Sequence, residues 1–427
     1  EANANRYTFV WSGTLNYHLA GLLDTTDALY QKYNTLLSEY QYGAKYDLGN
    51  AQMFIIEGMD KVRKVIEENR KRKLTKHKKI SNNTLIEILK LQQNLMLIAA
   101  GEGIAFVNGK GQKKPEIQQL YEELEKCGSR LMEYKSCFEI MGKDRNSYSK
   151  TDLEATFMRM KEDHMLNGQL KPAYNVQVAV ENYFIIHGYV SNDRTDYNTL
   201  IPVLEKHRKA FGDILEEVTA DSGYCSEKNL LYLKENTVAS YIKLQDHEQR
   251  KTRAYKEDIG KYYNMKYEVF EDEHYYVCHD GRELRHIRTE TREQDGYTQT
   301  FEVYGCADCS GCPHKEKCLY KYNAEKDAGK NKVMKVNERW EELKEESHSN
   351  IQSEKGILNR QIRSIQTEGH FGDIKENEKF RRFNYRSAEK VYKELMLYVI
   401  GRNINKYHRF LHDKIHKFEG KTGGKAA

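Results

Sequence analysis

The stretch that decides the fold is Ile214-Leu-Glu-Glu-Val-Thr-Ala-Asp-Ser-Gly-Tyr224, in the middle of the chain. Its apolar residues predict a short strand, and Gly223 predicts a turn directly behind it. Asp221 would therefore stand at the end of a strand, at the edge of a sheet. Acids beside glycine are also common in turns for backbone reasons alone, so this position by itself leaves the role of Asp221 open.

A second informative acid, Glu368, lies in Arg-Ser-Ile-Gln-Thr-Glu-Gly-His-Phe-Gly-Asp-Ile-Lys (363–375), a stretch with a helical pattern and basic residues on both sides. Most such glutamates are exposed and pair with a residue four positions away. Gly369 and Gly372 favour another interpretation, because glycine costs about 1 kcal/mol inside a helix. Two carboxylates from distant segments suit divalent metal ions, which prefer oxygen ligands and can hold a phosphodiester.

The elements around these acids follow from hydrophobic periodicity. Residues 15–70 and 82–140 read mostly as helices. Alternating valines from 176 to 180, followed by 183–190, predict a β-hairpin. A helix over 199–211 and a strand over 217–221 come next, and helices return over 335–410. This order of two strands, a helix and a strand suits a mixed sheet with covering helices, an α/β fold.

Charge is distributed unevenly along the chain. The net charge is only +5, but residues 60–79 carry ten Lys or Arg and three acids. Such a run favours contact with phosphates, although a solvated helix end is the alternative. No stretch is apolar for long enough to span a bilayer, and the polar start is no signal peptide; we therefore expect a cytoplasmic protein. The candidate DNA-binding residues are Arg70, Lys71, Arg72, Lys73, Arg381, Arg382 and Arg386.

Four of the eight cysteines form a cluster, Cys306, Cys309, Cys312 and Cys318. Their spacing can surround a tetrahedral Zn²⁺, with Cys278 or His314 as further ligands. An iron–sulfur cluster is also possible by ligand type, and a reduced, metal-free cluster is the alternative to both. A zinc ion with four thiolates would have no open position, so its role would be structural.

Four segments resemble the DDE-type transposases of bacterial insertion sequences: Glu-Ala-Asn-Ala-Asn-Arg-Tyr (1–7), Thr-Asp-Leu-Glu-Ala-Thr-Phe-Met-Arg (151–159), Ala-Tyr-Asn-Val-Gln-Val-Ala-Val-Glu (173–181) with Ala-Asp-Ser-Gly-Tyr (220–224), and the Glu368 block through Arg-Arg-Phe (381–383). They follow one another in the order found in the family. The resemblance implies a ribonuclease-H-like mixed sheet with flanking helices, interrupted by a helical insertion and a cysteine-rich insertion.

In domain terms, the resemblance implies a catalytic core that starts in 1–14, continues over 150–250 and ends with helices over 331–412. A helical insertion would occupy 15–149, a cysteine-rich insertion 251–330 and a basic disordered tail 413–427. In the family the first catalytic aspartate lies in an Asp-Gly-Thr turn just ahead of the segment that begins this chain. We therefore expect a fragment or truncated copy that lacks this acid, and Asp152 is interpreted as a structural or substrate-side acid.

The function implied by the resemblance is metal-dependent cleavage of DNA at insertion-sequence ends and joining of those ends to target DNA. Asp221 and Glu368 would hold Mg²⁺ or Mn²⁺, and the active form would be a homodimer on DNA, associated with the bacterial nucleoid. An inactive DNA-binding remnant of a transposase is the alternative, and a nuclease without strand transfer is a third possibility.

Overall fold

The computed structural model describes residues 1–46, 48, 82–109, 111–142, 145–160, 168–271, 273–294 and 296–412. Its contacts divide the chain into two compact units. Unit 1 comprises Glu1–Val176, Val190–Arg194 and Phe380–Ile400, and unit 2 comprises Gln177–Tyr189, Thr195–Lys379 and Gly401–Ala427. No helix among the described residues combines the length and apolar character needed to cross a membrane.

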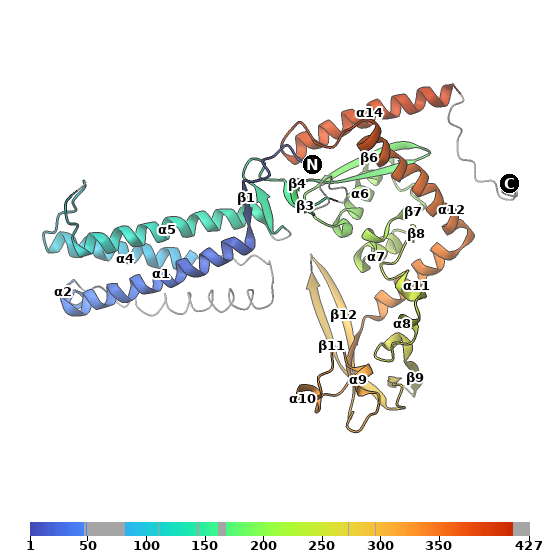
Figure 1. The fold of residues 1–427 in the computed structure, drawn as a ribbon, viewed down its shortest axis with the longest axis horizontal. Helices are drawn as coiled ribbons and strands as arrows, with labels where there is room; N and C mark the ends of the chain where they lie inside the picture. Colours follow the sequence, from blue (N-terminus) through green and yellow to red (C-terminus); the bar gives the residue numbers. More distant parts are fainter. Residues whose placement is uncertain are drawn as a thin grey trace. The chain divides into compact units, whose positions relative to one another are not determined.

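Unit 1 is built around three long helices that lie side by side (Figure 1). They are α1 (Ser12–Glu39), α4 (Asn82–Gly101) and α5 (Glu116–Met141), with the short α2 (Tyr42–Lys45) after α1. Their apolar faces form one core in which Leu95, Leu124 and Leu131 are fully buried. The helices predicted within 82–140 are thereby confirmed. The basic run, including Arg70, Lys71, Arg72 and Lys73, lies outside the described residues.

Short antiparallel strand pairs complete unit 1. Strand β1 (Phe9–Trp11) pairs with β2 (Ser147–Ser149), and β3 (Thr156–Arg159) pairs with β4 (Leu170–Ala173). Glu1 forms two hydrogen bonds with the segment before α14. Phe383 N donates to Glu1 O at 3.0 Å, and the Glu1 amino group donates to Arg381 O at 3.0 Å.

Unit 2 contains the predicted order of two strands, a helix and a strand. Strands β5 (Asn175–Glu181) and β6 (Phe184–Ser191) form the hairpin, followed by η1 (Asp196–Asn198), α6 (Leu200–Phe211) and β7 (Glu217–Ala220). The turn η2 (Ser222–Tyr224) and helix α7 (Glu227–Glu235) lead to β8 (Ala239–Ile242), which pairs with β7 in parallel. Among the described strands these pairs are separate two-stranded sheets. A continuous ribonuclease-H-like sheet therefore stays a prediction.

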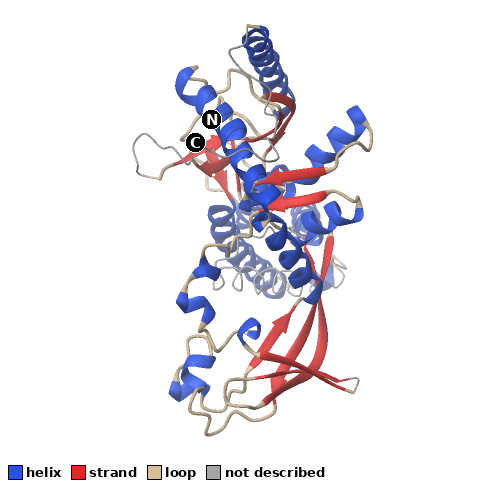
Figure 2. Cartoon of the chain, turned by 90° about the vertical axis from the view of Figure 1, so that its right-hand side faces the viewer, coloured by secondary structure: helices blue, strands red, loops and turns tan. Residues whose placement is uncertain are grey.

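The cysteine-rich part of unit 2 is an antiparallel sheet of five strands in the order β13-β12-β11-β10-β9 (Figure 2). The strands are β9 (Lys266–Phe270), β10 (Glu273–Val277), β11 (Glu283–Gln294), β12 (Tyr297–Cys306) and β13 (Val333–Val336). Short helices accompany them: η3 (Gln249–Lys251), α8 (Arg253–Lys256), η4 (Tyr262–Asn264), α9 (Lys315–Cys318) and α10 (Ala324–Asp327). Tyr275 lies in β10 and Thr300 in β12.

The last part of the chain is helical, as its sequence predicts, but it is not one regular helix. Helix α11 (Glu338–Gln352) turns sharply at Ser353 into α12 (Glu354–Arg363). The chain then alternates between π-helix and α-helix, through η5 (Ser364–Glu368), α13 (Gly369–Gly372) and η6 (Asp373–Asn377), before α14 (Ala388–Leu411). A side chain at Gly356 would meet the end of α11, since its Cβ would lie 2.8 Å from Ile351 Cα and closer still to Asn350 O.

The turn between α11 and α12 supplies a test of this packing. Gly356→Ala should destabilise the protein by about 1–3 kcal/mol, because the added methyl group collides with backbone atoms that cannot rotate away. Gly372→Ala is the matched control, since nothing would lie within 4 Å of a Cβ at that position, and it should be neutral or stabilise the helix by up to about 1 kcal/mol. Urea unfolding of both variants measures the difference; equal stability would contradict the observed turn.

Candidate active site

Asp221 stands where the sequence predicts it, directly after strand β7. Its Oδ1 accepts a hydrogen bond from Gly223 N at 2.5 Å and caps the turn η2. This contact is the backbone role expected of an aspartate beside a glycine. It uses one carboxylate oxygen and leaves the other for further contacts.

A second acid, Asp196, reaches the same place. A Cβ built on Gly223 would lie 2.9 Å from Asp196 Oδ2 and 3.1 Å from Asp221 Oδ1, so both carboxylates face one point beside this glycine. We call Asp196, Asp221 and Gly223 the acidic corner. The sequence patterns did not single out Asp196. The signal was nevertheless present, because Asp196 also follows a strand and opens a turn before a helix, although Asp193 fits that rule equally well.

Polar side chains orient the acidic corner. Gln177 Nε2 donates to Asp196 Oδ1 at 2.9 Å, and the Tyr224 hydroxyl donates to Gln177 Oε1. Burial raises the pKa of the Tyr224 phenol, the charges of Asp196 and Asp221 raise it further, and the positive charge of Arg363 lowers it. Tyr224 is therefore a neutral hydrogen-bond donor at physiological pH. Arg363 acts on the same phenol as the two acids, which places it near the corner.

Helix α12 is tied to strand β7 by side chains at a spacing of four residues. Glu217, the first residue of β7, forms an ion pair with Lys355 and accepts a hydrogen bond from Asn359 Nδ2 at 3.3 Å. Arg363 comes one turn later on the same face of the helix, because residues four apart are neighbours on an α-helix. Lys355, Asn359 and Arg363 therefore lie on the face of α12 that contacts β7, and Arg363 is the last residue of the helix.

The π-helix η5 continues this face to Glu368. A π-helix bonds residue i to residue i+5, which brings residues five apart into line and occurs frequently at functional sites. Arg363 Nη2 donates to Glu368 Oε1 at 2.8 Å, and Ser364 Oγ donates to Oε2 at 3.1 Å. The Glu368 side chain is 59% exposed. It is therefore an accessible carboxylate next to the arginine that lies near the acidic corner.

The opposite face of this helical segment is buried. Gln366 and His370 lie under the hairpin turn, where Gln366 Oε1 accepts from Tyr183 N at 3.3 Å and His370 Nε2 contacts Tyr183 O at 2.8 Å. Arg402 Nη2 lies 3.3 Å from His370 Nδ1 and 2.9 Å from Asp373 Oδ2. These contacts match a neutral imidazole that donates through Nε2 and accepts at Nδ1. They fix the orientation that points Glu368 outward.

Residues 277–408 match a protein family described as the transposase DDE domain. Over these residues the chain is similar to the DDE-type transposases, and the match supports a transposase. The matched segment includes Glu368 and the cysteine cluster, whereas Asp196 and Asp221 precede it. Transposases act on DNA, so the match implies DNA as a partner. Comparisons with curated proteins and with solved structures found no significant match.

The acids of the transposase fit a divalent cation by chemistry but are not placed around one. Carboxylate oxygens are the ligands that Mg²⁺ and Mn²⁺ prefer, and the acidic corner offers two carboxylates. Among the described residues, however, no group of three or more His, Cys, Asp or Glu side chains is arranged to hold a metal ion. Glu368 instead pairs with Arg363. A complete metal site would therefore need Glu368 to leave this ion pair.

Asp152 of the transposase has a different environment. It is buried, at 5% exposure, and both its oxygens accept from the Tyr174 hydroxyl at 2.9 Å. The Ser387 amide lies 3.4 Å from each oxygen. These donors satisfy the carboxylate inside unit 1 and join the start of α14 to the loop before β3. The geometry gives Asp152 a structural role.

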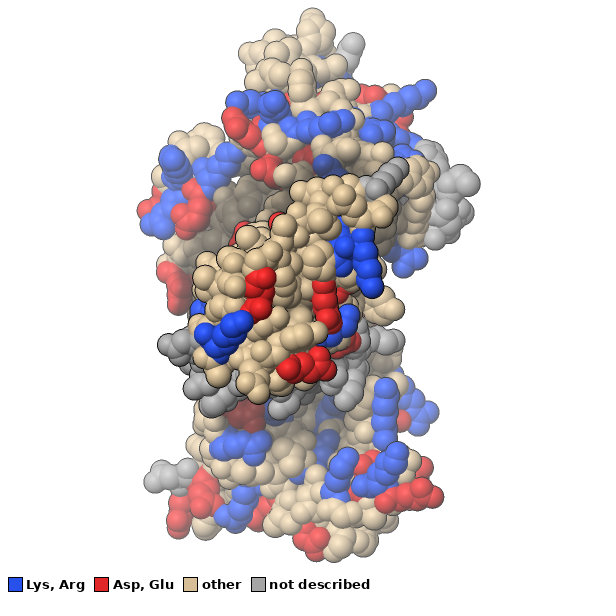
Figure 3. All heavy atoms as spheres, turned by 90° about the vertical axis from the view of Figure 1, so that its left-hand side faces the viewer, with Lys and Arg blue, Asp and Glu red and all other residues tan. Residues whose placement is uncertain are grey.

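The predicted DNA contacts after Glu368 lie in unit 1. Arg382 Nη2 donates to Ala4 O at 3.2 Å, and Arg386 Nε donates to Asn3 O at 2.9 Å. Both arginines thus support the first residues of the chain, while Arg381 is exposed beside them. On the face drawn in Figure 3, Lys and Arg side chains are interspersed with Asp and Glu and form no continuous basic surface among the described residues. Phosphate binding by these arginines stays a prediction.

The buried His370 makes stability depend on pH. Burial lowers the pKa of His370 below the usual 6.5, and this is the largest effect. The hydrogen bond with Tyr183 O raises the pKa in part, the charges of Arg402 and Lys406 lower it, and Asp373 raises it slightly. Burial also lowers the pKa values of His187 and His247. As pH falls below about 6.5, the unfolded chain takes up protons that the folded chain does not, so the free energy of unfolding must fall.

We therefore expect lower stability in urea at pH 5.5 than at pH 7.5. His370→Gln keeps a donor toward Tyr183 O but cannot become protonated, so it should reduce this pH dependence while lowering stability at pH 7.5. A single histidine changes the free energy of unfolding by at most about 1.4 kcal/mol per pH unit. A wild-type protein that is equally stable at both values would contradict the buried neutral histidines.

Gly223 provides a separate test of the acidic corner. In Gly223→Ala the new methyl group would push the carboxylates of Asp196 and Asp221 away from their common point. Displacement of about 1 Å at a reacting centre can cost a hundredfold in rate, so DNA cleavage should fall by about that factor with the fold retained. Gly21→Ala in α1, where nothing lies near the added atom, is the control. Equal cleavage by both variants would show that the corner is not part of the site.

Proposed function

We propose that this transposase cuts DNA at the ends of a transposable element and joins those ends to target DNA with the help of Mg²⁺ or Mn²⁺. Asp221 and Glu368 supply metal-binding carboxylates, and Asp196 adds one beside Asp221. The observation that supports this most directly is the convergence of Asp196 and Asp221 at Gly223, directly after strand β7, which contacts α12. Helix α12 leads through Arg363 to Glu368.

A divalent cation bound by such carboxylates lowers the pKa of a bound water or 3′-hydroxyl group and stabilises the leaving oxygen of a phosphodiester. The chain's own residues prepare for it. Gln177 and Tyr224 orient Asp196, and Gly223 leaves room for both acids of the corner. The neutral Tyr224 phenol adds no negative charge to the site. The two like charges of the acidic corner repel each other, and a cation between them would remove that cost.

Glu368 and Arg363 form a pair that is inexpensive to open. Their side chains are 59% and 25% exposed, and exposed ion pairs contribute only about 0–1 kcal/mol. When Glu368 turns toward a cation, Arg363 becomes free to bind a DNA phosphate, since arginine suits bidentate phosphate contacts. Without metal, Arg363 thus holds Glu368 near the acidic corner. When a metal ion is bound, Arg363 is available for a DNA phosphate.

DNA binding in this proposal comes from the basic run at 60–79 and from Arg381, Arg382 and Arg386. Contacts of this kind release counterions, so the affinity should fall steeply with salt. Because a transposable element has two ends, we propose that a homodimer brings them together in the bacterial nucleoid. The alternative, an inactive DNA-binding remnant, is favoured by one observation, the ion pair that occupies Glu368.

The test compares DNA cleavage and strand transfer by the full-length product of the gene and by Asp221→Asn, Glu368→Gln and Asp196→Asn. The first two variants should lose activity by at least about a hundredfold in Mg²⁺ or Mn²⁺ and keep their affinity for DNA. Asp196→Asn should lose less, because its share in metal binding is secondary. Glu354→Gln is the matched control, since Glu354 is an exposed acid at the start of α12.

The outcomes separate the alternatives. Loss in Asp221→Asn and Glu368→Gln with an active Glu354→Gln supports the proposed transposase. Salt-dependent DNA binding without cleavage by any form would identify a remnant. Cleavage without joining would identify a nuclease. Full activity in Glu368→Gln would show that the assigned site is wrong.

A further inference from the structure

Five of the eight cysteines come together at one pocket at the end of the five-stranded sheet. Cys278 follows β10, Cys306 ends β12, and the other three lie in the following loop and in α9. The pocket is also lined by Arg282, Leu284, Lys315, Leu319 and Lys332, and the cysteines are Cys278, Cys306, Cys309, Cys312 and Cys318. All five thiols are free of disulfides. The cluster seen in the sequence thus gains a fifth member from the end of an earlier strand.

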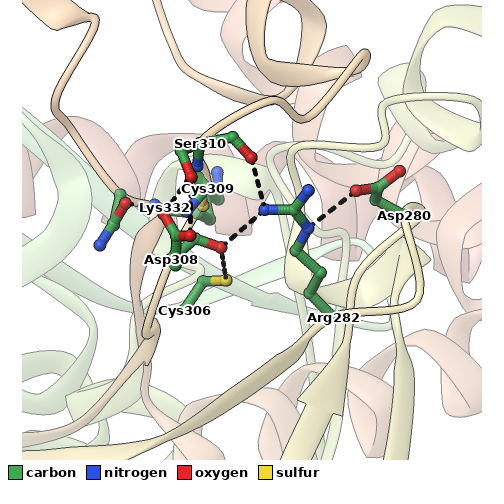
Figure 4. A network of polar contacts seen from close by, with 8 residues as sticks. Asp280, Arg282, Cys306, Asp308, Cys309, Ser310 and Lys332 are labelled. Carbon is green, nitrogen blue, oxygen red and sulfur yellow. Dashed lines mark hydrogen bonds and ion pairs between the residues drawn. The ribbon is translucent and has the colours of Figure 1, made fainter.

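The loop around Cys309 is held by hydrogen bonds that also reach sulfur. Lys332 N donates to Cys309 Sγ at 3.3 Å, and Cys309 N donates to Asn331 Oδ1 at 3.0 Å. Arg282 Nη1 donates to the carbonyl oxygens of Asp308 and Ser310 at 2.9 and 3.0 Å (Figure 4). A backbone amide directed at sulfur stabilises a thiolate more than a thiol, because hydrogen bonds to the charged form favour it. The loop is therefore ordered in a way that suits a metal-bound Cys309.

Positive charge surrounds the pocket. Arg282, Lys315 and Lys332 all line it, and Lys332 Nζ donates to Gly260 O at 2.6 Å and to Cys318 O at 3.0 Å. A zinc ion with four thiolates carries a net charge of about −2. Lys315 and Lys332 would offset part of that charge, whereas Arg282 already forms an ion pair with Asp280 at 2.8 Å. A cluster of neutral thiols that served only as hydrophobic packing would gain nothing from them.

The thiol lining of the pocket suits a single tetrahedral ion, because four thiolates complete the coordination of Zn²⁺. The sulfur atoms do not yet form a ligand set among the described residues. Binding therefore requires them to turn inward about their single χ1 angle.

One of the five cysteines has its thiol directed at its own loop. Cys306 Sγ donates to Asp308 O at 3.2 Å, and it also interacts with Cys309 and Cys278. Cys318 interacts electrostatically with Cys278, Cys309 and Cys312. We propose that Cys278, Cys309, Cys312 and Cys318 bind one structural Zn²⁺, with Cys306 as a packing residue. The four thiol protons pass to solvent when the four sulfur–metal bonds form. The ion would join the β10–β11 turn to α9.

The test is the metal content of the full-length protein, purified without added metal and measured by mass spectrometry, together with its thermal stability. The wild type should carry about one zinc ion per chain, and Cys278→Ser should carry almost none and melt at a lower temperature. Cys306→Ser should keep its zinc, and Cys225→Ser, outside the pocket, is the control. If Cys278→Ser fails to fold, Co²⁺ titration of metal-depleted wild type should still give the absorption spectrum of a tetrahedral thiolate site.

Three results would overturn this assignment: no metal in the wild type and no Co²⁺ spectrum, iron in place of zinc, or loss of zinc in Cys306→Ser with retention in Cys278→Ser. DNA cleavage is not a readout here. Failure of the zinc site therefore leaves the proposed transposase function untouched, and the reverse also holds.

Discussion

Glu217, the first residue of β7, contacts Lys355 and Asn359 on successive turns of α12, and these contacts align the helix with the strand. The position of Arg363, and through it of Glu368, depends on that alignment. A regular α-helix would turn the residue five positions after Arg363 away from the strand, and the π-helix at 364–368 corrects this. Asp221 and Glu368, far apart in the sequence, are thus connected through one strand and one irregular helix.

A cation bound at the acidic corner would change the repulsion between its two carboxylates. Asp196 and Asp221 face a common point, and their like charges repel each other. Both acids raise the pKa of the Tyr224 phenol, whereas the positive charge of Arg363 lowers it. Gln177 donates to Asp196 and the Gly223 amide donates to Asp221, and these hydrogen bonds orient the pair. Two carboxylates that face one point favour a cationic ligand.

The sequence predicts those elements whose signals are local. The hairpin that ends at Ser191 and strand β7 follow from alternating or continuous apolar residues, and Asp221 follows from the strand–turn pattern. Asp196 could not be distinguished from Asp193 on that basis, because only the tertiary contact with Gly223 separates them. The sequence offered Cys278 and His314 equally as further ligands, and strand pairing brings Cys278 to the thiol pocket. The π-helix has no sequence signal beyond its glycines, and the arrangement of the sheets could not be derived from strand order alone.

The central claim is that Asp221, Asp196 and Glu368 meet around a divalent cation. The most direct measurement is a crystal structure of the protein grown with Mn²⁺, with the ion located from its anomalous scattering. The account predicts a Mn²⁺ ion bonded to oxygens of Asp221 and Asp196 at about 2.0–2.2 Å, with Glu368 turned toward it and away from Arg363. Glu368 still paired with Arg363, and no anomalous signal at the acidic corner at millimolar Mn²⁺, would contradict it.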